Sequence, residues 1–67
     1  MIEVTINGDR RQVESGQTLA QLLSALRLDP RMVVIERNGE IVARDRLGET
    51  TIAAGDTLEI VQMMAGG

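Results

Sequence analysis

Hydrophobic and polar residues alternate at the start of the chain. Residues 1–6 carry isoleucine or valine at every second position, which is the pattern of a strand with one buried face. Asn7-Gly8 follows and predicts a tight hairpin, because both central residues of a type I′ turn need positive φ. We expect residues 10–14 to form the returning strand, with Val13 as its clear core residue.

The next hydrophobic residues have the spacing of a helix. Leucines recur three and four residues apart, at Leu19, Leu22, Leu23 and Leu26. Thr18 has the side chain of a helix N-cap, and Gln21 stands where it would complete a capping box. Asp29-Pro30 is expected to end the helix, because proline cannot continue it. The pattern predicts one short helix with a single leucine stripe.

A second hairpin is predicted in the middle of the chain. Residues 32–37 are largely apolar and β-branched and lead into Asn38-Gly39, so a strand should turn sharply and pair with residues 40–43. In both predicted hairpins we assign the asparagine-glycine pair plain turn geometry and no further role.

One more strand is predicted in the last third. Residues 44–51 are polar and are expected to be irregular, with a turn at Gly48. A turn at Gly55-Asp56 then precedes a strand over residues 57–62, in which leucine and isoleucine alternate with polar residues.

The order of elements predicts one α+β domain over residues 1–67. The leucine helix should cover one face of a mixed sheet of four to five strands. The opposite face, called the open face below, is left to solvent or a partner. Alternation places Val34, Val61 and Met63 on the open face. An apolar patch there favours a docking surface over scattered surface valines.

Composition narrows the function classes. The chain has no cysteine, histidine or tyrosine, so the usual thiolate and imidazole ligands and the commonest general acid or base are missing. It is not expected to be an enzyme or to bind a metal. A net charge of −3 and the absence of aromatic residues disfavour nucleic-acid binding. With no membrane-length apolar run and no signal peptide, we expect a cytoplasmic protein without a membrane partner.

The last two residues of the sequence are Gly66 and Gly67, and a pair of glycines at this place suggests a function. Glycine packs against nothing and is the costliest residue to order, so a folded domain seldom needs it there. A frayed terminus or a cloning scar is the plainer interpretation. We expect residues 63–67 to form an extended flexible tail, thin enough to enter a narrow channel and present a carboxylate to another protein.

Together these features resemble the ubiquitin-like β-grasp sulfur carriers, and more narrowly the ThiS family of thiamine biosynthesis. The segments that carry the resemblance are residues 2–7, 16–18 with the leucine helix, 36–42, 55–56 and 65–67. Unlike ubiquitin, the chain has no lysine and its tail has no charge. The resemblance implies a ubiquitin-like β-grasp fold.

The resemblance also implies a chemistry for Gly67. A ThiF-like adenylating enzyme would activate its carboxylate with ATP and Mg²⁺, and a cysteine desulfurase or another donor would supply the sulfur of a thiocarboxylate. A ThiG-like thiazole synthase would take that sulfur for the thiazole ring of thiamine. The chain itself would be a carrier and co-substrate that binds no cofactor.

Residue roles follow from the resemblance. Gly67 would carry the acyl group, and Gly66 would keep the approach narrow. The expected partner-binding residues are Val34, Val61, Met63, Met64 and Ala65. For the two methionines, packing at the end of the strand is the alternative. Acidic residues such as Glu59 or Asp56 are expected to meet basic groups of a partner.

Other functions stay open at this point. The chain could be a molybdopterin-synthase small subunit or another β-grasp sulfur carrier, which would bind its large subunit tightly. It could be a ubiquitin-like protein modifier, for which high-mass conjugates would be the sign. It could also be a β-grasp binding module that keeps its function when Gly66-Gly67 is deleted.

Overall fold

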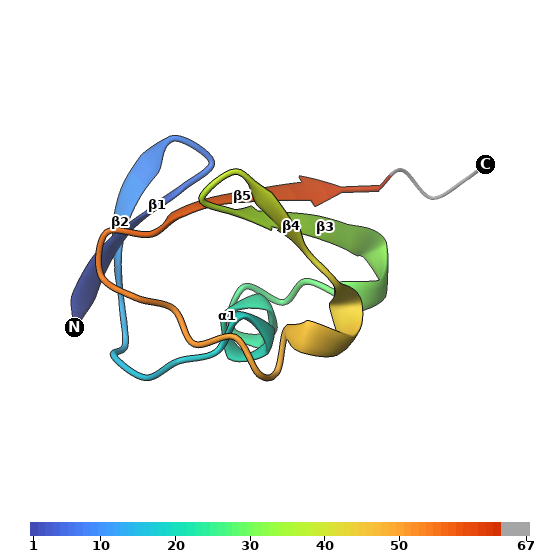
Figure 1. Ribbon diagram of the computed structural model, residues 1–67, viewed down its shortest axis with the longest axis horizontal. Coiled ribbons are helices and arrows are strands. Elements are labelled where there is room, and N and C mark those ends of the chain that lie inside the picture. The colour runs from blue at the N-terminus through green and yellow to red at the C-terminus, as the bar shows by residue number, and fades with distance from the viewer. Residues whose placement is uncertain (64–67) are drawn as a thin grey trace.

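The computed structural model describes residues 1–63, which form five strands, one α-helix and two short 3-10 helices (Figure 1). The strands are β1 (Ile2–Ile6), β2 (Asp9–Val13), β3 (Val33–Arg37), β4 (Glu40–Val42) and β5 (Thr57–Gln62). The helices are α1 (Leu19–Ala25), η1 (Pro30–Met32) and η2 (Arg44–Arg46). The expected tail residues Met64, Ala65, Gly66 and Gly67 lie outside the described residues.

The last strand lies in the middle of the sheet. The strand order is β2-β1-β5-β3-β4, with β5 parallel to β1 and antiparallel to β3. Each hairpin, β1 with β2 and β3 with β4, is antiparallel. The predicted mixed sheet is therefore confirmed, and β5 joins its two hairpins.

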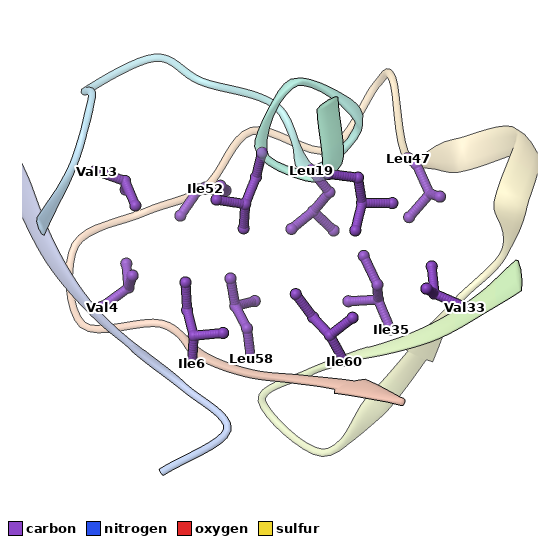
Figure 2. Packing of buried hydrophobic residues seen from close by; sticks show 12 residues of the cluster. Val4, Ile6, Val13, Leu19, Val33, Ile35, Leu47, Ile52, Leu58 and Ile60 are labelled. Carbon is purple, nitrogen blue, oxygen red and sulfur yellow. The ribbon is translucent and has the colours of Figure 1, made fainter. Parts of the chain in front are cut away.

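The helix covers one face of this sheet, and the core lies between them (Figure 2). Helix α1 contributes three leucines to the core, Leu19, Leu22 and Leu23. The sheet contributes Val4, Ile6, Val13, Val33, Ile35, Leu58 and Ile60. The loops add Leu47 and Ile52. This core is entirely aliphatic, as a chain without aromatic residues requires. The other sheet face carries no further layer among the described residues (Figure 1).

Both predicted hairpin turns are confirmed. Asn7 and Gly8 have φ of 50° and 85°, and Asn38 and Gly39 have φ of 52° and 87°. Two-residue turns of this kind match the twist of the strands that they connect. The first turn fixes the register, and β2 therefore begins at Asp9, one residue earlier than predicted.

The start of the helix is confirmed, but its predicted end is wrong. Thr18 caps α1 and exchanges hydrogen bonds with Gln21 in a capping box. The helix ends at Ala25, before the proline. Arg27 then takes a left-handed conformation with φ of 60°, and its N–H donates to the carbonyl of Ser24. The next amide, that of residue 28, donates to the carbonyl of residue 23, which completes a Schellman motif.

The segment over residues 44–51 is more ordered than predicted. It begins with η2, and Thr50 Oγ1 donates to the carbonyl of Arg46 at 2.8 Å. Leu47 is buried in the core, and its carbonyl accepts a hydrogen bond from the Ala20 N–H. A single leucine among polar residues gives no periodic signal, so the sequence did not reveal this core position.

Candidate functional site: the open face and the end of β5

Strand β5 is the central strand of the sheet and leads the chain toward its C-terminal end. It pairs with β1 on one side and with β3 on the other. Beyond the strand, the Met63 N–H donates to the carbonyl of Met32 at 2.7 Å. The described chain is therefore held by backbone hydrogen bonds up to Met63.

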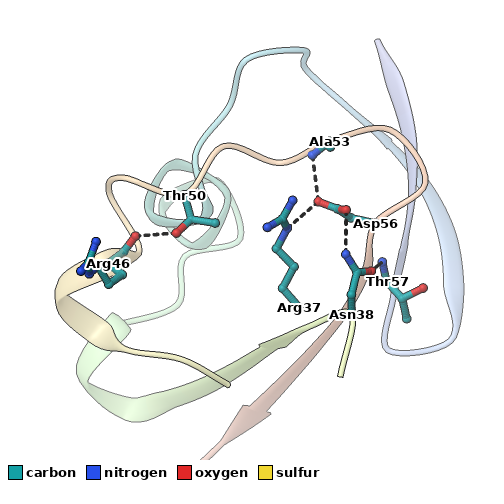
Figure 3. Close-up of polar contacts among 7 residues, drawn as sticks. All are labelled: Arg37, Asn38, Arg46, Thr50, Ala53, Asp56 and Thr57. Carbon is teal, nitrogen blue, oxygen red and sulfur yellow. Dashed lines mark hydrogen bonds and ion pairs between the residues drawn. The ribbon is translucent and has the colours of Figure 1, made fainter. Parts of the chain in front are cut away.

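The two turn asparagines hold β5 from both sides. Asn7 Nδ2 donates to the carbonyl of Ile60 at 3.1 Å, and the Ile60 N–H donates to Asn7 Oδ1 at 2.7 Å. Asn38 Oδ1 accepts from the Thr57 N–H at 2.9 Å (Figure 3). The plain-turn interpretation of these asparagines was therefore incomplete. Their positive φ was predictable from the following glycine, but their hydrogen bonds to β5 were not.

Asp56 is a buried anchor for the turn before β5 (Figure 3). Its Oδ2 accepts from Arg37 Nε at 2.8 Å and from the Ala53 N–H at 2.8 Å. Its Oδ1 accepts from Asn38 Nδ2 at 3.0 Å. Because only 6% of this side chain is exposed, the expectation that Asp56 meets basic groups of a partner is wrong.

The environment of Asp56 favours its charged form. Burial by itself would raise the pKa of this carboxyl. The hydrogen bonds from Ala53, Arg37 and Asn38, with the positive charge of Arg37, outweigh burial and hold the pKa below its usual value. The ionised carboxylate therefore stabilises the folded chain.

The open face carries an apolar patch at the end nearest Met63. Val34 and Val61 lie directly opposite each other on β3 and β5. Val61 is 53% exposed, Met63 43% and Ile41 69%, while Val34 is half-buried. The structure thus brings Val34, Val61 and Met63 together, as alternation predicted. We name Val34, Ile41, Val61 and Met63 the apolar patch.

The structure adds Ile41 to the patch predicted from the sequence, and it places two glutamates, Glu36 and Glu59, next to that patch. Ile41 lies on the edge strand β4 opposite Glu36, and Glu36 is in turn opposite Glu59 of β5. The alternation of polar and apolar residues over 40–42 could have placed Ile41 on the open face, but three residues are too few for the pattern to be convincing. Glu59 is exposed beside the apolar patch, and its contact with a basic group of a partner stays a prediction.

In residues 1–63, no group of three or more acidic, cysteine or histidine side chains is arranged to hold a metal ion. No helix in that range is long and apolar enough to cross a membrane. The four predicted site residues Met64, Ala65, Gly66 and Gly67 lie outside it.

Comparison with known proteins gives a family match and similar proteins. The model of the ThiS family matches residues 4–67, which includes Gly66-Gly67. A thiazole synthase of Paramagnetospirillum magneticum is 38% identical over 66 residues, which are 98% of this chain and 20% of that protein. The sulfur carrier protein ThiS of Bacillus subtilis is 36% identical over 63 residues, covering 92% of this chain and 96% of that protein.

A solved structure has the same fold. The crystal structure of the thiamine biosynthesis protein ThiS from Geobacter metallireducens superposes with a TM-score of 0.84 at 33% identity. The match covers 98% of this chain and 100% of that one. The chain therefore spans nearly all of the ThiS proteins but about a fifth of the thiazole synthase.

Proposed function

The chain belongs to the ThiS family, and from this membership we propose that it is a sulfur carrier for synthesis of the thiazole moiety of thiamine. The observation that carries the proposal is that the family match runs through residue 67, so it includes the paired glycines as well as the folded body. The Bacillus relative, which is a sulfur carrier protein by name, supports the same function.

The proposed chemistry takes place on the Gly67 carboxylate. A carboxylate is a poor electrophile, because its negative charge resists attack and oxide is a poor leaving group. Attack of the carboxylate on the α-phosphorus of ATP releases pyrophosphate and gives an acyl adenylate. A sulfide or persulfide sulfur then displaces AMP; with a persulfide, a further reductive S–S cleavage frees the thiocarboxylate.

The folded body supplies recognition rather than catalysis. A chain without cysteine and histidine offers no nucleophile or base of the usual kind for these steps. We assign the first step to a ThiF-like adenylating enzyme that uses ATP and Mg²⁺, and sulfur supply to a cysteine desulfurase or another donor. Dependence on ATP agrees with action in the cytoplasm.

We assign the acceptor role to a ThiG-like thiazole synthase. Two thiazole synthases, from Paramagnetospirillum magneticum and Magnetococcus marinus, each contain a stretch similar to this chain within a longer protein. A carrier and its acceptor have reason to be joined in one chain, because the tail must reach the acceptor's active site. This observation supports thiazole synthase over other acceptors.

Intact-protein mass spectrometry tests the proposal. The chain is incubated with a ThiF-type enzyme, ATP and a sulfur source, and we expect a mass gain equal to one oxygen replaced by sulfur. The variant lacking Gly67 should show no gain. If the unaltered chain gains no mass while the same enzyme converts another carrier, the proposed function is wrong.

A further inference from the structure

The edge strand β2 has main-chain groups that no other strand of residues 1–63 uses. Thr5 of β1 donates its N–H to a carbonyl in the turn before β5. Main-chain groups point alternately to the two sides of a strand, so Val4 bonds to the other side, where it is opposite Arg11 of β2. The N–H and C=O groups of Arg10 and Gln12 therefore point outward, at the free edge of the sheet (Figure 1).

A groove runs between this edge strand and α1, on the helix side of the sheet. A cavity of about 340 Å³ lies there, lined in part by Val13 of β2 and by Leu22 and Ala25 of α1. A neighbouring cavity of about 470 Å³ shares Arg11 and Leu26 with it. Ala25 is exposed and Leu26 is half-buried, so both can contact another molecule. We name the two cavities together the β2 groove.

Two adjacent arginines make the edge strand basic. The strand has two arginines against one aspartate, whereas the whole chain has a net charge of −3. Arg11 points to the helix side, as the buried Val13 does, and Arg10 points to the opposite face. Both arginines are exposed, and within residues 1–63 neither forms a salt bridge. The other charged residues that line the groove are Asp9 and Glu14. An acidic group at the middle of β2 would meet an arginine on either face.

We propose that the β2 groove binds an extended segment of another protein, with apolar side chains at alternate positions and an acidic residue beside them. The segment would add a strand to the sheet, with its main chain bonded to the outward groups of Arg10 and Gln12. Every second side chain would then enter the groove, because side chains alternate between the two faces of a strand. The acidic residue would form a charge-assisted hydrogen bond with Arg11.

A second copy of the chain fits the groove less well. If two β2 strands paired edge to edge, the side chains offered to the groove would be those of Asp9, Arg11 and Val13 of the other copy. Asp9 and Arg11 are charged, and Val13 is buried in its own core. The partner strand must therefore bring apolar side chains that β2 itself does not have to spare.

A defined peptide tests the inference by NMR spectroscopy of the isotope-labelled full chain. In the probe peptide, valine and isoleucine alternate with threonine, and aspartates follow. The control peptide has the same composition, with its apolar residues placed together so that alternation is lost. With the probe peptide, the amide signals of residues 10–14, Ala25 and Leu26 should shift most. The control peptide should bind about tenfold more weakly or worse.

Hydrogen exchange distinguishes strand addition from simple filling of the groove. The amides of Arg10 and Gln12 point outward in the free chain, whereas that of Arg11 faces β1. At a free peptide concentration about tenfold above the Kd, exchange of the two outward amides should slow about tenfold. The Arg11 amide serves as the internal reference. Unchanged exchange at Arg10 and Gln12 in the saturated complex would overturn the proposed strand addition.

A variant of the groove wall has a matched control on the same helix. Ala25→Glu places bulk and negative charge beside the aspartates of the peptide, so the Kd should rise about tenfold or more. Ser24 is exposed on α1 but lines neither cavity, and Ser24→Glu should keep the Kd within about twofold. A dispersed spectrum for each variant shows that it is folded.

The arginines are tested by a pair of double variants. Replacing Arg10 and Arg11 by glutamine should raise the Kd about fivefold and reduce its dependence on salt. Replacing Arg44 and Arg46 of η2 by glutamine makes the same charge change away from β2, and the Kd should stay within about twofold. Equal effects of the two double variants would show that only the net charge of the chain matters, which would overturn the role given to β2.

The remaining outcomes are equally decisive. The inference is overturned if the probe peptide causes no shifts, if it binds no better than its control, or if its shifts centre on the apolar patch. Signals of β2 that shift with chain concentration alone would assign the edge to a second copy and would also overturn it. The inference does not depend on the chemistry at Gly67, so deletion of Gly67 should leave the Kd for the peptide unchanged. A chain that forms no thiocarboxylate would overturn the proposed function alone.

Discussion

At the scale of single residues, Asp56 shows how one buried charge joins distant segments. Its carboxylate connects the turn before β5, through the Ala53 amide, to the β3–β4 hairpin, through Arg37 and Asn38 (Figure 3). A buried charge is costly unless it is paired and hydrogen-bonded, and each Asp56 oxygen has at least one partner. The group therefore stabilises the chain in its ionised form.

This leads to a prediction for pH. Because the pKa of Asp56 is lower in the folded chain than its usual value of about 3.9, its contribution is full above that value. It is lost as pH falls through the lower folded pKa, so the unfolding free energy should decline below about pH 4. Urea denaturation at a series of pH values measures this decline, and Asp56→Asn should flatten it.

A control for this prediction is Asp29. Its pKa is also lowered, chiefly by a side-chain hydrogen bond from Arg31, but the ion pair lies at the surface. Asp29→Asn should leave most of the pH dependence in place. If Asp56→Asn and the unaltered chain lose stability in parallel below pH 4, the buried carboxylate is not the cause.

Asn7 gives a second prediction at this scale. Asn7→Gly keeps the positive φ that the turn needs but removes both hydrogen bonds to Ile60. We expect the unfolding free energy to fall by about 1–2 kcal/mol, measured by chemical denaturation. Asn7→Asp, which keeps an acceptor for the Ile60 amide, should lose less. Equal stability of Asn7→Gly and the unaltered chain would show that the turn alone matters.

At the scale of elements, α1 is short and depends on its ends. Its capping box satisfies amides at the start, and the Schellman motif satisfies carbonyls at the end. The motif places Arg27 in the left-handed region, where a residue with a Cβ is strained. Just after the helix, the sequence therefore places a residue with a side chain where the backbone favours glycine.

Replacement of Arg27 should therefore relieve strain. We expect Arg27→Gly to raise the unfolding free energy by about 0.5–1 kcal/mol, because glycine adopts positive φ without a Cβ clash. Arg27→Ala keeps the Cβ and should stay close to the unaltered chain. Thermal unfolding of the three proteins compares them, and a gain for alanine equal to that for glycine would contradict the explanation.

At the scale of the whole molecule, the folded body and the last residues are expected to be separable. The core is closed by residues such as Leu22 and Ile60, which are 3% and 8% exposed. Truncation of buried side chains of this size leaves a cavity and costs about 2–5 kcal/mol. Leu22→Ala and Ile60→Ala should therefore unfold at lower denaturant concentration.

Changes at Gly66 and Gly67 should affect the chemistry of the chain but not its stability. Deletion of Gly67 or the substitution Gly66→Val is expected to abolish thiocarboxylate formation, while the unfolding free energy stays within about 0.5 kcal/mol. Mass spectrometry and denaturation of the same samples give both quantities. A tail variant that unfolds the body would show that these glycines are structural.

Much of the fold was predictable from the sequence because its signals are local. The hairpins at Asn7-Gly8 and Asn38-Gly39 and the capping box from Thr18 to Gln21 each involve residues at most three positions apart. Their conformations depend on steric limits and hydrogen bonds within those few residues. The strand pattern likewise predicted that Val34, Val61 and Met63 share the open face.

What only the tertiary structure decided involves residues far apart in the chain. Asn7 and Ile60 are 53 positions apart, and no local rule pairs them. The central place of β5 sets two further features: Asp56 is buried beside Arg37, and Glu36 lies opposite Glu59. The sequence by itself determined the elements and their buried faces. The packing of those elements decided which charges are buried and which lie opposite one another on the surface.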